Sequence, residues 1–85
     1  DFNNIEGDLI VIYDNEPRNK EICRQIEKSI AQGSKVCLFP ETTQEKDIND
    51  MFIAGSTKKE IQQTITDNTF SGAAAKLRFA EWRRI

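Results

Sequence analysis

The segment LIVIYDNEPRN, Leu9 to Asn19, predicts a buried strand that runs into a polar turn. An apolar run this short, followed at once by turn-forming residues, is typical of a strand covered on both faces, as in parallel sheets. Asp14 and Glu16 are therefore expected at the carboxyl end of that strand, the edge at which ligands bind in open α/β sheets. Two carboxylates in one turn can share a hard cation, since Mg²⁺ takes one or two protein carboxylates together with substrate phosphate oxygens. In the alternative interpretation, Asp14 or Asn15 only caps the following helix.

The residues after this turn predict a helix and a second buried strand. Pro17 suits the first turn of a helix, and Gly33 is expected to end that helix in a left-handed conformation. The apolar stripe of the helix recurs at every fourth position (Ile22, Ile26 and Ile30). Residues 35–39 form the second apolar strand. Strands joined by one helix run parallel with a right-handed crossover, so the turn after Phe39 is expected to open on the same edge as Asp14.

Three more helices are expected after the second strand. Asp47 is expected to start a short helix that Gly55 ends. Thr57 and Glu60 match a capping box, which predicts the next helix. Ser71 is expected to cap the last one, which runs to the end of the sequence. The fold class is therefore α/β, with a parallel strand–helix–strand unit followed by three helices.

The composition describes a small globular domain with few reactive side chains. The chain has 85 residues, with two cysteines and no histidine. A zinc site or a thiol–imidazole nucleophile is therefore excluded within it, and Cys23 and Cys37 are expected to be reduced core thiols. No segment resembles a signal peptide or a membrane span, so we expect an intracellular protein without membrane contact. Because the sequence begins at Asp1 rather than methionine, we expect a piece of a longer protein.

The two predicted strands do not make a complete sheet. Fully apolar parallel strands need neighbouring strands and cover on both faces, and a two-stranded sheet is marginally stable in water. The isolated chain is therefore expected to belong to a larger sheet or to self-associate through a strand edge.

The end of the chain is basic and aromatic. Residues 71–85 hold four basic groups and one acidic group, a net charge of +3, whereas the preceding residues hold eight basic and thirteen acidic groups, a net charge of −5. Phe79 and Trp82 either belong to the core or form an exposed docking surface, and aromatic residues at helical spacing favour the core. Arg83 and Arg84 beside them suit single-stranded DNA or an acidic groove on a partner protein, of which we favour the partner.

Taken together, these motifs resemble a known family of enzymes. The runs DNEPRNKE and KDINDMFIAG, followed by a small-residue helix ending in WRRI, are similar to the carboxyl-terminal half of a Toprim domain. They resemble more closely the end of the DNA primases of T-even-type bacteriophages, over a range from Asp8 to Ile85. The resemblance implies the second half of a Rossmann-like parallel sheet in residues 1–55, a Toprim-like catalytic domain, and a helical extension in residues 56–85.

The resemblance also implies a reaction and its participants. The parent protein would synthesise short RNA primers from ribonucleotides on a single-stranded DNA template, by Mg²⁺-dependent nucleotidyl transfer. Its family works with a replicative helicase during phage DNA replication in the bacterial cytoplasm.

The family's functional residues can be carried over to matching positions. Asp14 and Glu16 match its pair of catalytic, metal-binding acids, and Asp47 matches the first acid of a later acidic turn that also binds metal. Asn49 stands where bacterial primases have a second aspartate. The catalytic glutamate of Toprim domains and the zinc-binding template-recognition domain belong further upstream, so the isolated chain is expected to be inactive.

Three basic residues lie close in sequence to these acids, namely Arg18, Lys20 and Lys46. Their side chains can meet the phosphates of a nucleotide or of the template. They can equally balance the charge of the neighbouring acids. The sequence leaves both interpretations open.

Two other functions compete with primer synthesis. One is another Toprim-type nucleic-acid enzyme, a topoisomerase or a nuclease; a topoisomerase needs a strand-cleaving tyrosine, and Tyr13 lies inside the first strand. The other is an interaction module in which residues 57–85 dock on a helicase. Metal binding separates these classes, because a docking module should not bind Mg²⁺ through Asp14.

Overall fold

The computed structural model describes residues 4–5 and 8–85 and has an α/β fold. In this part of the chain one mixed sheet has the strand order β1 (Asn4–Ile5), β2 (Asp8–Ile12), β3 (Lys35–Cys37) and β4 (Thr69–Phe70). β2 and β3 are parallel, whereas β1 and β4 each pair antiparallel with their neighbour. The prediction that β2 and β3 are parallel is confirmed, but the prediction of a wholly parallel sheet is wrong. Residues 1–3 and 6–7, which the sequence assigned to the first unit, lie outside the described residues.

β4 gives β3 a neighbour that the sequence did not predict. Thr69 pairs with Cys37 and Phe70 with Val36. A strand of two residues shows too little alternation to be recognised from sequence, so residues 67–69 indicated only the end of a helix. Because β2 and β3 each pair with a further strand, the expectation that these two strands lack neighbours is wrong.

α1 (Lys20–Ala31) begins later than predicted. Its N-cap is Asn19, whose side-chain oxygen accepts a hydrogen bond from the Ile22 backbone N–H at 3.0 Å. Pro17 therefore precedes the helix instead of occupying its first turn, and that expectation is wrong. The left-handed end at Gly33 is confirmed, with φ of 84°.

The interpretation of Asp14 or Asn15 as only the cap of the following helix is also wrong. Asp14 and Asn15 lie upstream of the true cap, in a tight turn closed by the Glu16 backbone N–H donating to the Asp14 carbonyl at 2.8 Å. Asn19 in turn donates its backbone N–H to the Glu16 carbonyl at 3.0 Å. Residues 14–16 are called the acidic turn below. Their side chains do not cap α1.

The three later helices begin where the sequence predicted them: α2 (Ile48–Ile53), α3 (Lys58–Asp67) and α4 (Gly72–Trp82). The expectation that the last helix runs to the end of the sequence is wrong, because the backbone becomes extended at Arg83. Asp47 caps α2 through its side chain, and Gly55 follows α2 with φ of 105°. Thr57 and Glu60 exchange the two hydrogen bonds of a capping box. Ser71 occupies the N-cap position of α4, but its side chain makes no capping hydrogen bond, so only its position is confirmed.

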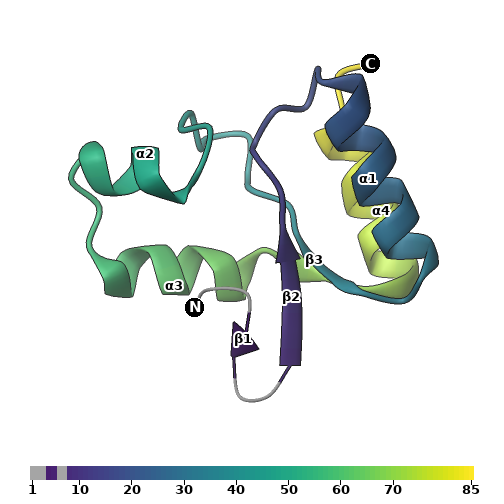
Figure 1. Cartoon of the computed structure of the whole chain (residues 1–85), viewed down its shortest axis with the longest axis horizontal. Coiled ribbons are helices and arrows are strands. Elements are labelled where there is room, and N and C mark those ends of the chain that lie inside the picture. Colours follow the sequence, from purple (N-terminus) through teal and green to yellow (C-terminus); the bar gives the residue numbers. More distant parts are fainter. Residues whose placement is uncertain (1–3, 6–7) are drawn as a thin grey trace.

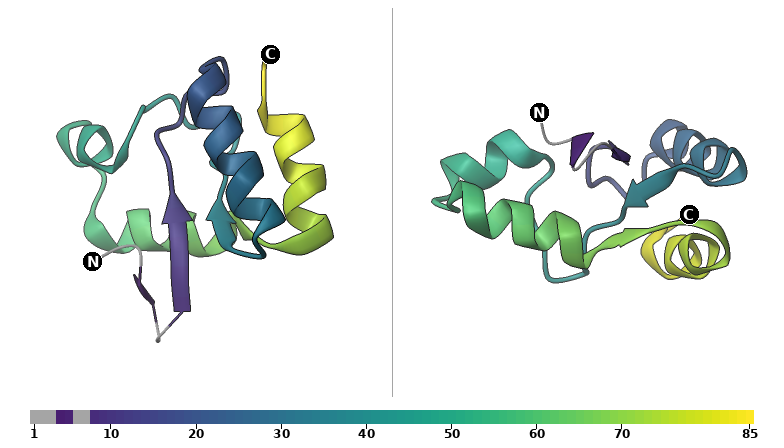
Figure 2. Two further views of the ribbon diagram at one scale, coloured as in Figure 1. Left: turned by 45° about the vertical axis from the view of Figure 1, so that its right-hand side comes forward. Right: turned by 90° about the horizontal axis from the view of Figure 1, so that it is seen from below.

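The sheet lies between two helical layers (Figure 1). α1 and α4 lie side by side on one side of it, and α2 and α3 on the other, as the view from below shows most clearly (Figure 2). Val36 and Leu38 point into the core with α1 and α4, whereas Cys37 and Phe39 point into the core with α2 and α3. The second apolar segment is therefore buried on both faces, as predicted.

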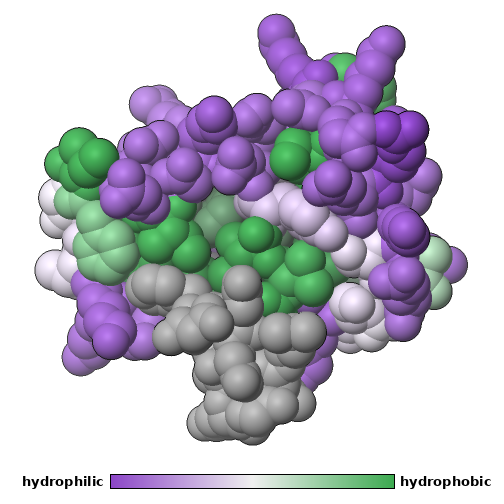
Figure 3. Space-filling view, in the orientation of Figure 1, coloured by the Kyte–Doolittle hydropathy of each residue, from purple (hydrophilic) through white to green (hydrophobic). Residues whose placement is uncertain are grey.

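Apolar side chains gather in the middle of the face shown in Figure 3, with hydrophilic side chains above them. Ile12 and Ile48 are half-buried against the core of α2 and α3. Phe52 and Ile53 at the end of α2 are 42% and 76% exposed. No helix in the described residues is both long and apolar enough to cross a bilayer.

The capping box of α3 is expected to make part of the stability depend on pH. Hydrogen bonds from the Thr57 backbone, and secondly from its side chain, hold the pKa of the Glu60 carboxyl below its ordinary value of 4.5. A folded pKa that is lowered means that the stabilisation is present above the unfolded pKa and is lost as pH falls through the folded pKa. Glu60→Gln keeps the hydrogen-bond acceptor without titrating, so its melting temperature should fall less than that of the wild type from about pH 7 to about pH 3. An equal fall in melting temperature for the two proteins across this pH range would contradict the prediction.

Candidate functional site

The turns after β2 and β3 meet at the carboxyl edge of the sheet. The Asn15 backbone N–H donates to the Lys46 carbonyl at 2.6 Å. The side-chain amide of Asn15 donates to the carbonyls of Thr43 and Glu45 at 3.0 and 3.1 Å. The prediction that both turns open on one edge is therefore confirmed, and Asn15 is the residue that joins them.

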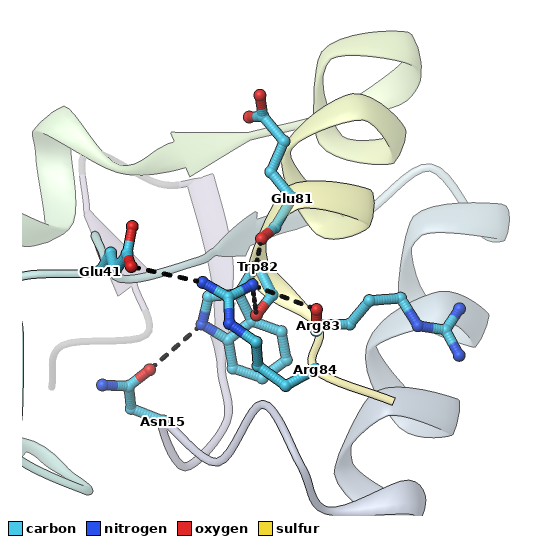
Figure 4. Close-up of polar contacts among 6 residues, drawn as sticks. All are labelled: Asn15, Glu41, Glu81, Trp82, Arg83 and Arg84. Atoms are coloured by element: carbon cyan, nitrogen blue, oxygen red, sulfur yellow. Dashed lines mark hydrogen bonds and ion pairs between the residues drawn. The ribbon is translucent and has the colours of Figure 1, made fainter.

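Asn15 also connects this edge to the last helix. Its side-chain oxygen accepts a hydrogen bond from the Trp82 indole N–H at 3.1 Å (Figure 4). From the sequence, Asn15 was considered only as a possible helix cap. No local sequence pattern predicts its hydrogen bond to Trp82, which lies 67 positions further along the chain. One amide thus holds together the acidic turn, the loop after β3 and the end of α4.

The three acids predicted to bind metal have different surroundings in the structure. Asp14 is half-buried in the acidic turn. Glu16 lies 3.6 Å from the Lys46 ammonium and also accepts a hydrogen bond from the Asn19 amide at 3.3 Å. One carboxylate oxygen of Asp47 accepts the Asp50 backbone N–H at 2.8 Å as the cap of α2. Among residues 4–5 and 8–85, no group of three or more acidic, histidine or cysteine side chains is arranged to hold a metal ion.

The acidic turn still fits a hard cation in its donor chemistry. Asp14 and Glu16 offer carboxylate oxygens only, and Mg²⁺ is commonly held by one or two carboxylates, with water and substrate phosphates as the other ligands. Lys46 lies where it would compete with a cation for Glu16. The turn therefore suits a weak, substrate-completed site better than a closed cage of protein ligands.

The three basic residues predicted to meet phosphates are not equivalent. Lys46 pairs with Glu16, which supports the charge-balancing interpretation for this lysine. Arg18 is exposed beside the acidic turn and lines a cavity at the sheet edge. Lys20 is the first residue of α1 and lines a separate hollow with Arg83.

Phe79 and Trp82 belong to the core. They are 5% and 8% exposed, and their rings stack with centroids 6.2 Å apart. The core interpretation is confirmed, and the two rings offer no exposed docking surface in this structure. Burial has a clear cause, because α4 packs its aromatic side against α1 and β3.

The two final arginines are engaged within the chain. Arg84 donates to the carbonyls of Glu81, Trp82 and Arg83, closing the end of α4, and pairs with Glu41 at 3.8 Å (Figure 4). The Arg84 backbone N–H donates to the carbonyl of Pro17, the residue that directly follows the acidic turn, at 2.8 Å. A cation at the last carbonyls of a helix is favoured by the helix dipole. The segment after α4 is thus fastened beside the acidic turn.

Arg83 covers the buried aromatic pair from outside. Its guanidinium lies 5.1 Å from the centre of the Phe79 ring and 3.9 Å from the Glu27 carboxylate. Both contacts are intramolecular, so a partner that bound Arg83 or Arg84 would have to replace existing interactions. This competition was not predicted from the sequence.

The cysteines are unsuited to catalysis. Cys23 and Cys37 are free and buried, as predicted. Burial raises the pKa of the Cys37 thiol to about 12, and the Arg78 charge offsets this only in part. A thiol that stays protonated at neutral pH is a poor nucleophile.

These observations define a class of protein: a small α/β unit with an acidic turn at the carboxyl edge of its sheet. No protein-family model matches the chain. The chain is, however, 29% identical over 76 residues to the DNA primase of Enterobacteria phage T4. The match spans 87% of this chain but 22% of that primase, so the chain corresponds to about a fifth of its relative's length. The similarity supports a relationship to DNA primases.

Proposed function

We propose that the chain is the carboxyl-terminal part of a DNA primase, in which the acidic turn holds Mg²⁺ for nucleotidyl transfer. The similarity to the T4 phage primase supports the relationship. The observation that carries the assignment of the site is the set of Asn15 hydrogen bonds, which hold Asp14 and Glu16 against the loop that leads to Asp47. Acids gathered in this way at the carboxyl edge of parallel strands suit a phosphate-handling site.

Each acid has a separate part in this proposal. Asp14 and Glu16 would hold the ion, and Asp47 would support it with the carboxylate oxygen that does not cap α2. Bound Mg²⁺ neutralises charge on the attacking, non-bridging and leaving oxygens of a phosphoryl group. Asn15 would keep the two acids in place, and Lys46, which lies 3.6 Å from the Glu16 carboxylate, would compete with the cation for it.

The reaction itself is proposed for the longer protein. Its Toprim-like domain would include residues 1–55, with residues 56–85 as an extension whose last helix packs on α1. The substrates would be ribonucleotides and a single-stranded DNA template, and the partner a replicative helicase in the bacterial host cytoplasm. The family's catalytic glutamate and its zinc domain have no counterpart in these 85 residues, so the chain by itself should not make primers.

Metal titration of the chain tests the proposal. Trp82 is the sole tryptophan and contacts Asn15, so it should sensitise the luminescence of Tb³⁺, an oxygen-seeking substitute for Mg²⁺, bound at the acidic turn. We expect Mg²⁺ to displace Tb³⁺, and Asp14→Asn to weaken binding about tenfold or more, since one of the two principal charged ligands is lost. Asp67→Asn, the same change at an exposed residue of α3, is the matched control and should bind as the wild type does.

Equal binding by Asp14→Asn and the wild type would contradict the metal site. The chain would then fit the competing class better, an interaction module that docks through residues 57–85. The internal contacts of Arg83 and Arg84 count against that alternative.

A further inference from the structure

A cavity of about 550 Å³ opens at the same sheet edge, between the acidic turn, the loop after β3 and the end of α4. Its volume lies within the range of about 300–1,000 Å³ that is typical of small-molecule sites. Three guanidinium groups line it, contributed by the residues between the acidic turn and α1 (Arg18), by α4 (Arg78) and by the segment that follows α4 (Arg84). None of the three carboxylates assigned to the metal lines the cavity, so the two sites can be separated by experiment.

Arg78 is incompletely paired by the protein. Its Nε atom is buried and has no hydrogen-bond partner among the described residues. Its Nη2 atom makes only long hydrogen bonds, 3.5 Å to the Leu38 carbonyl and 3.4 Å to the Asn68 side chain, and the group lies over the Phe70 ring. A buried donor without an acceptor is unfavourable. An anion in the cavity would supply acceptors to this guanidinium.

The other two guanidinium groups can also reach an anion. Arg18 is exposed and forms no ion pair within the described residues. Arg84 pairs with Glu41 at 3.8 Å, but the Glu41 side chain is 88% exposed. Exposed pairs of this kind contribute little to stability, so an anion can replace the Glu41 carboxylate at small cost.

The charge balance of the cavity favours an anion. The three arginines face two carboxylates, Glu41 and Glu81, which leaves a net charge of +1 on the lining side chains. The carboxylate of Glu81 points away from the Arg84 guanidinium (Figure 4). Arginine forks match the oxygens of phosphate groups in geometry as well as charge.

We propose that this cavity binds the phosphate groups of a nucleotide or of a nucleic acid strand without a metal ion, through Arg18, Arg78 and Arg84. The proposal goes beyond the metal-dependent site, because it uses none of the acids in the acidic turn. Both sources present the same phosphate esters, so the choice between them is left to the experiment.

The fluorescence of Trp82, which lines the cavity and is the sole tryptophan, provides the readout. The chain is titrated in EDTA with sodium triphosphate, with ATP and with a short oligothymidylate. Saturable binding of triphosphate and ATP indicates a free nucleotide as the source. Saturable binding of the oligonucleotide alone indicates a strand.

Two variants with opposite effects make the test specific. Arg18→Gln should weaken binding about tenfold, as expected when one charge-assisted contact is lost. Glu41→Gln should tighten it, because a competing carboxylate is removed. Arg24→Gln and Asp67→Asn, the same charge changes at exposed residues outside this cavity, are the controls and should leave binding unchanged.

Three results would overturn the proposal. One is the absence of saturable binding for every probe, and another is an equal loss in Arg18→Gln and Arg24→Gln. The third is binding that needs Mg²⁺ and disappears in Asp14→Asn, which would instead support the proposed metal site. A failure of the cavity and a failure of the metal site are therefore distinguishable.

Discussion

Asn15→Ala should destabilise the chain by about 3 kcal/mol, a large effect for a domain of this size. The substitution removes three side-chain hydrogen bonds, to Thr43, Glu45 and Trp82. It also leaves the indole N–H of Trp82, a residue only 8% exposed, without its acceptor. Thermal denaturation followed by circular dichroism should show a melting temperature lowered by roughly 10–20 °C.

Two other variants separate the role of Asn15 from a general effect of losing an asparagine. Asn19→Ala removes the N-cap of α1 and should destabilise by about 1 kcal/mol. Trp82→Phe keeps an aromatic ring but loses the bond to Asn15, and its effect should not add to that of Asn15→Ala, because both remove the same contact. A loss in Asn15→Ala no larger than that in Asn19→Ala would argue against Asn15 as the joint of the three segments.

The features predicted correctly are those that neighbouring residues determine. The second apolar run, the left-handed glycines 33 and 55, and the capping box at Thr57 each depend on a few adjacent positions, and each is present. The first run forms a strand, but its predicted burial on both faces is wrong, because Val11, Ile12 and Tyr13 are only half-buried. The shared edge of the two turns also followed from sequence, because a strand–helix–strand unit has one strongly preferred connection. Such rules act within a few residues or one connection, so they can be applied without knowing the rest of the fold.

The features that were missed depend on contacts between distant segments. β4 exists because Thr69 and Phe70 reach β3, and the hydrogen bond between Asn15 and Trp82 requires α4 to pack on α1. The start of α1 was misplaced for a different reason. Both Pro17 and Asn19 are residues that commonly occur near the start of a helix. The hydrogen-bonded turn at residues 14–19 determines that the helix begins after Asn19.

The candidate site shows the same division. The edge at which the two turns meet followed from the sequence, and charge balance by Lys46 was one of the two interpretations left open, but the internal contacts of Arg84 were not predicted. Lys46 balances Glu16, and Arg84 closes α4, so two of the residues assigned to ligands or partners have partners within the chain. Only the packing of α4 against the sheet edge brings Arg18 and Arg78 to one cavity.

Asp14→Asn in the longer primase-related protein should nearly abolish primer synthesis, lowering its rate on the order of 100-fold or more, as when a charge-stabilising group is removed from an active site. The amide preserves the shape of the side chain but removes the negative charge on which the proposed Mg²⁺ site depends. Because Asn19 and not Asp14 caps α1, the substitution should leave folding nearly unchanged. Turnover and its Mg²⁺ dependence should therefore change while the melting temperature does not.

Asp47→Asn supplies the comparison within the same protein. Asp47 caps α2 through the Asp50 backbone N–H, and an asparagine can make that hydrogen bond equally well. Asp47→Asn should lose less activity than Asp14→Asn, because one oxygen of Asp47 already accepts the capping hydrogen bond. In addition, Asn49, two residues further on, is not a second acid. Primer yield measured over a range of Mg²⁺ concentrations distinguishes the two variants, since added Mg²⁺ should partly restore Asp47→Asn and not Asp14→Asn. A folded Asp14→Asn protein that primes at nearly the normal rate would show that the acidic turn does not bind the catalytic metal.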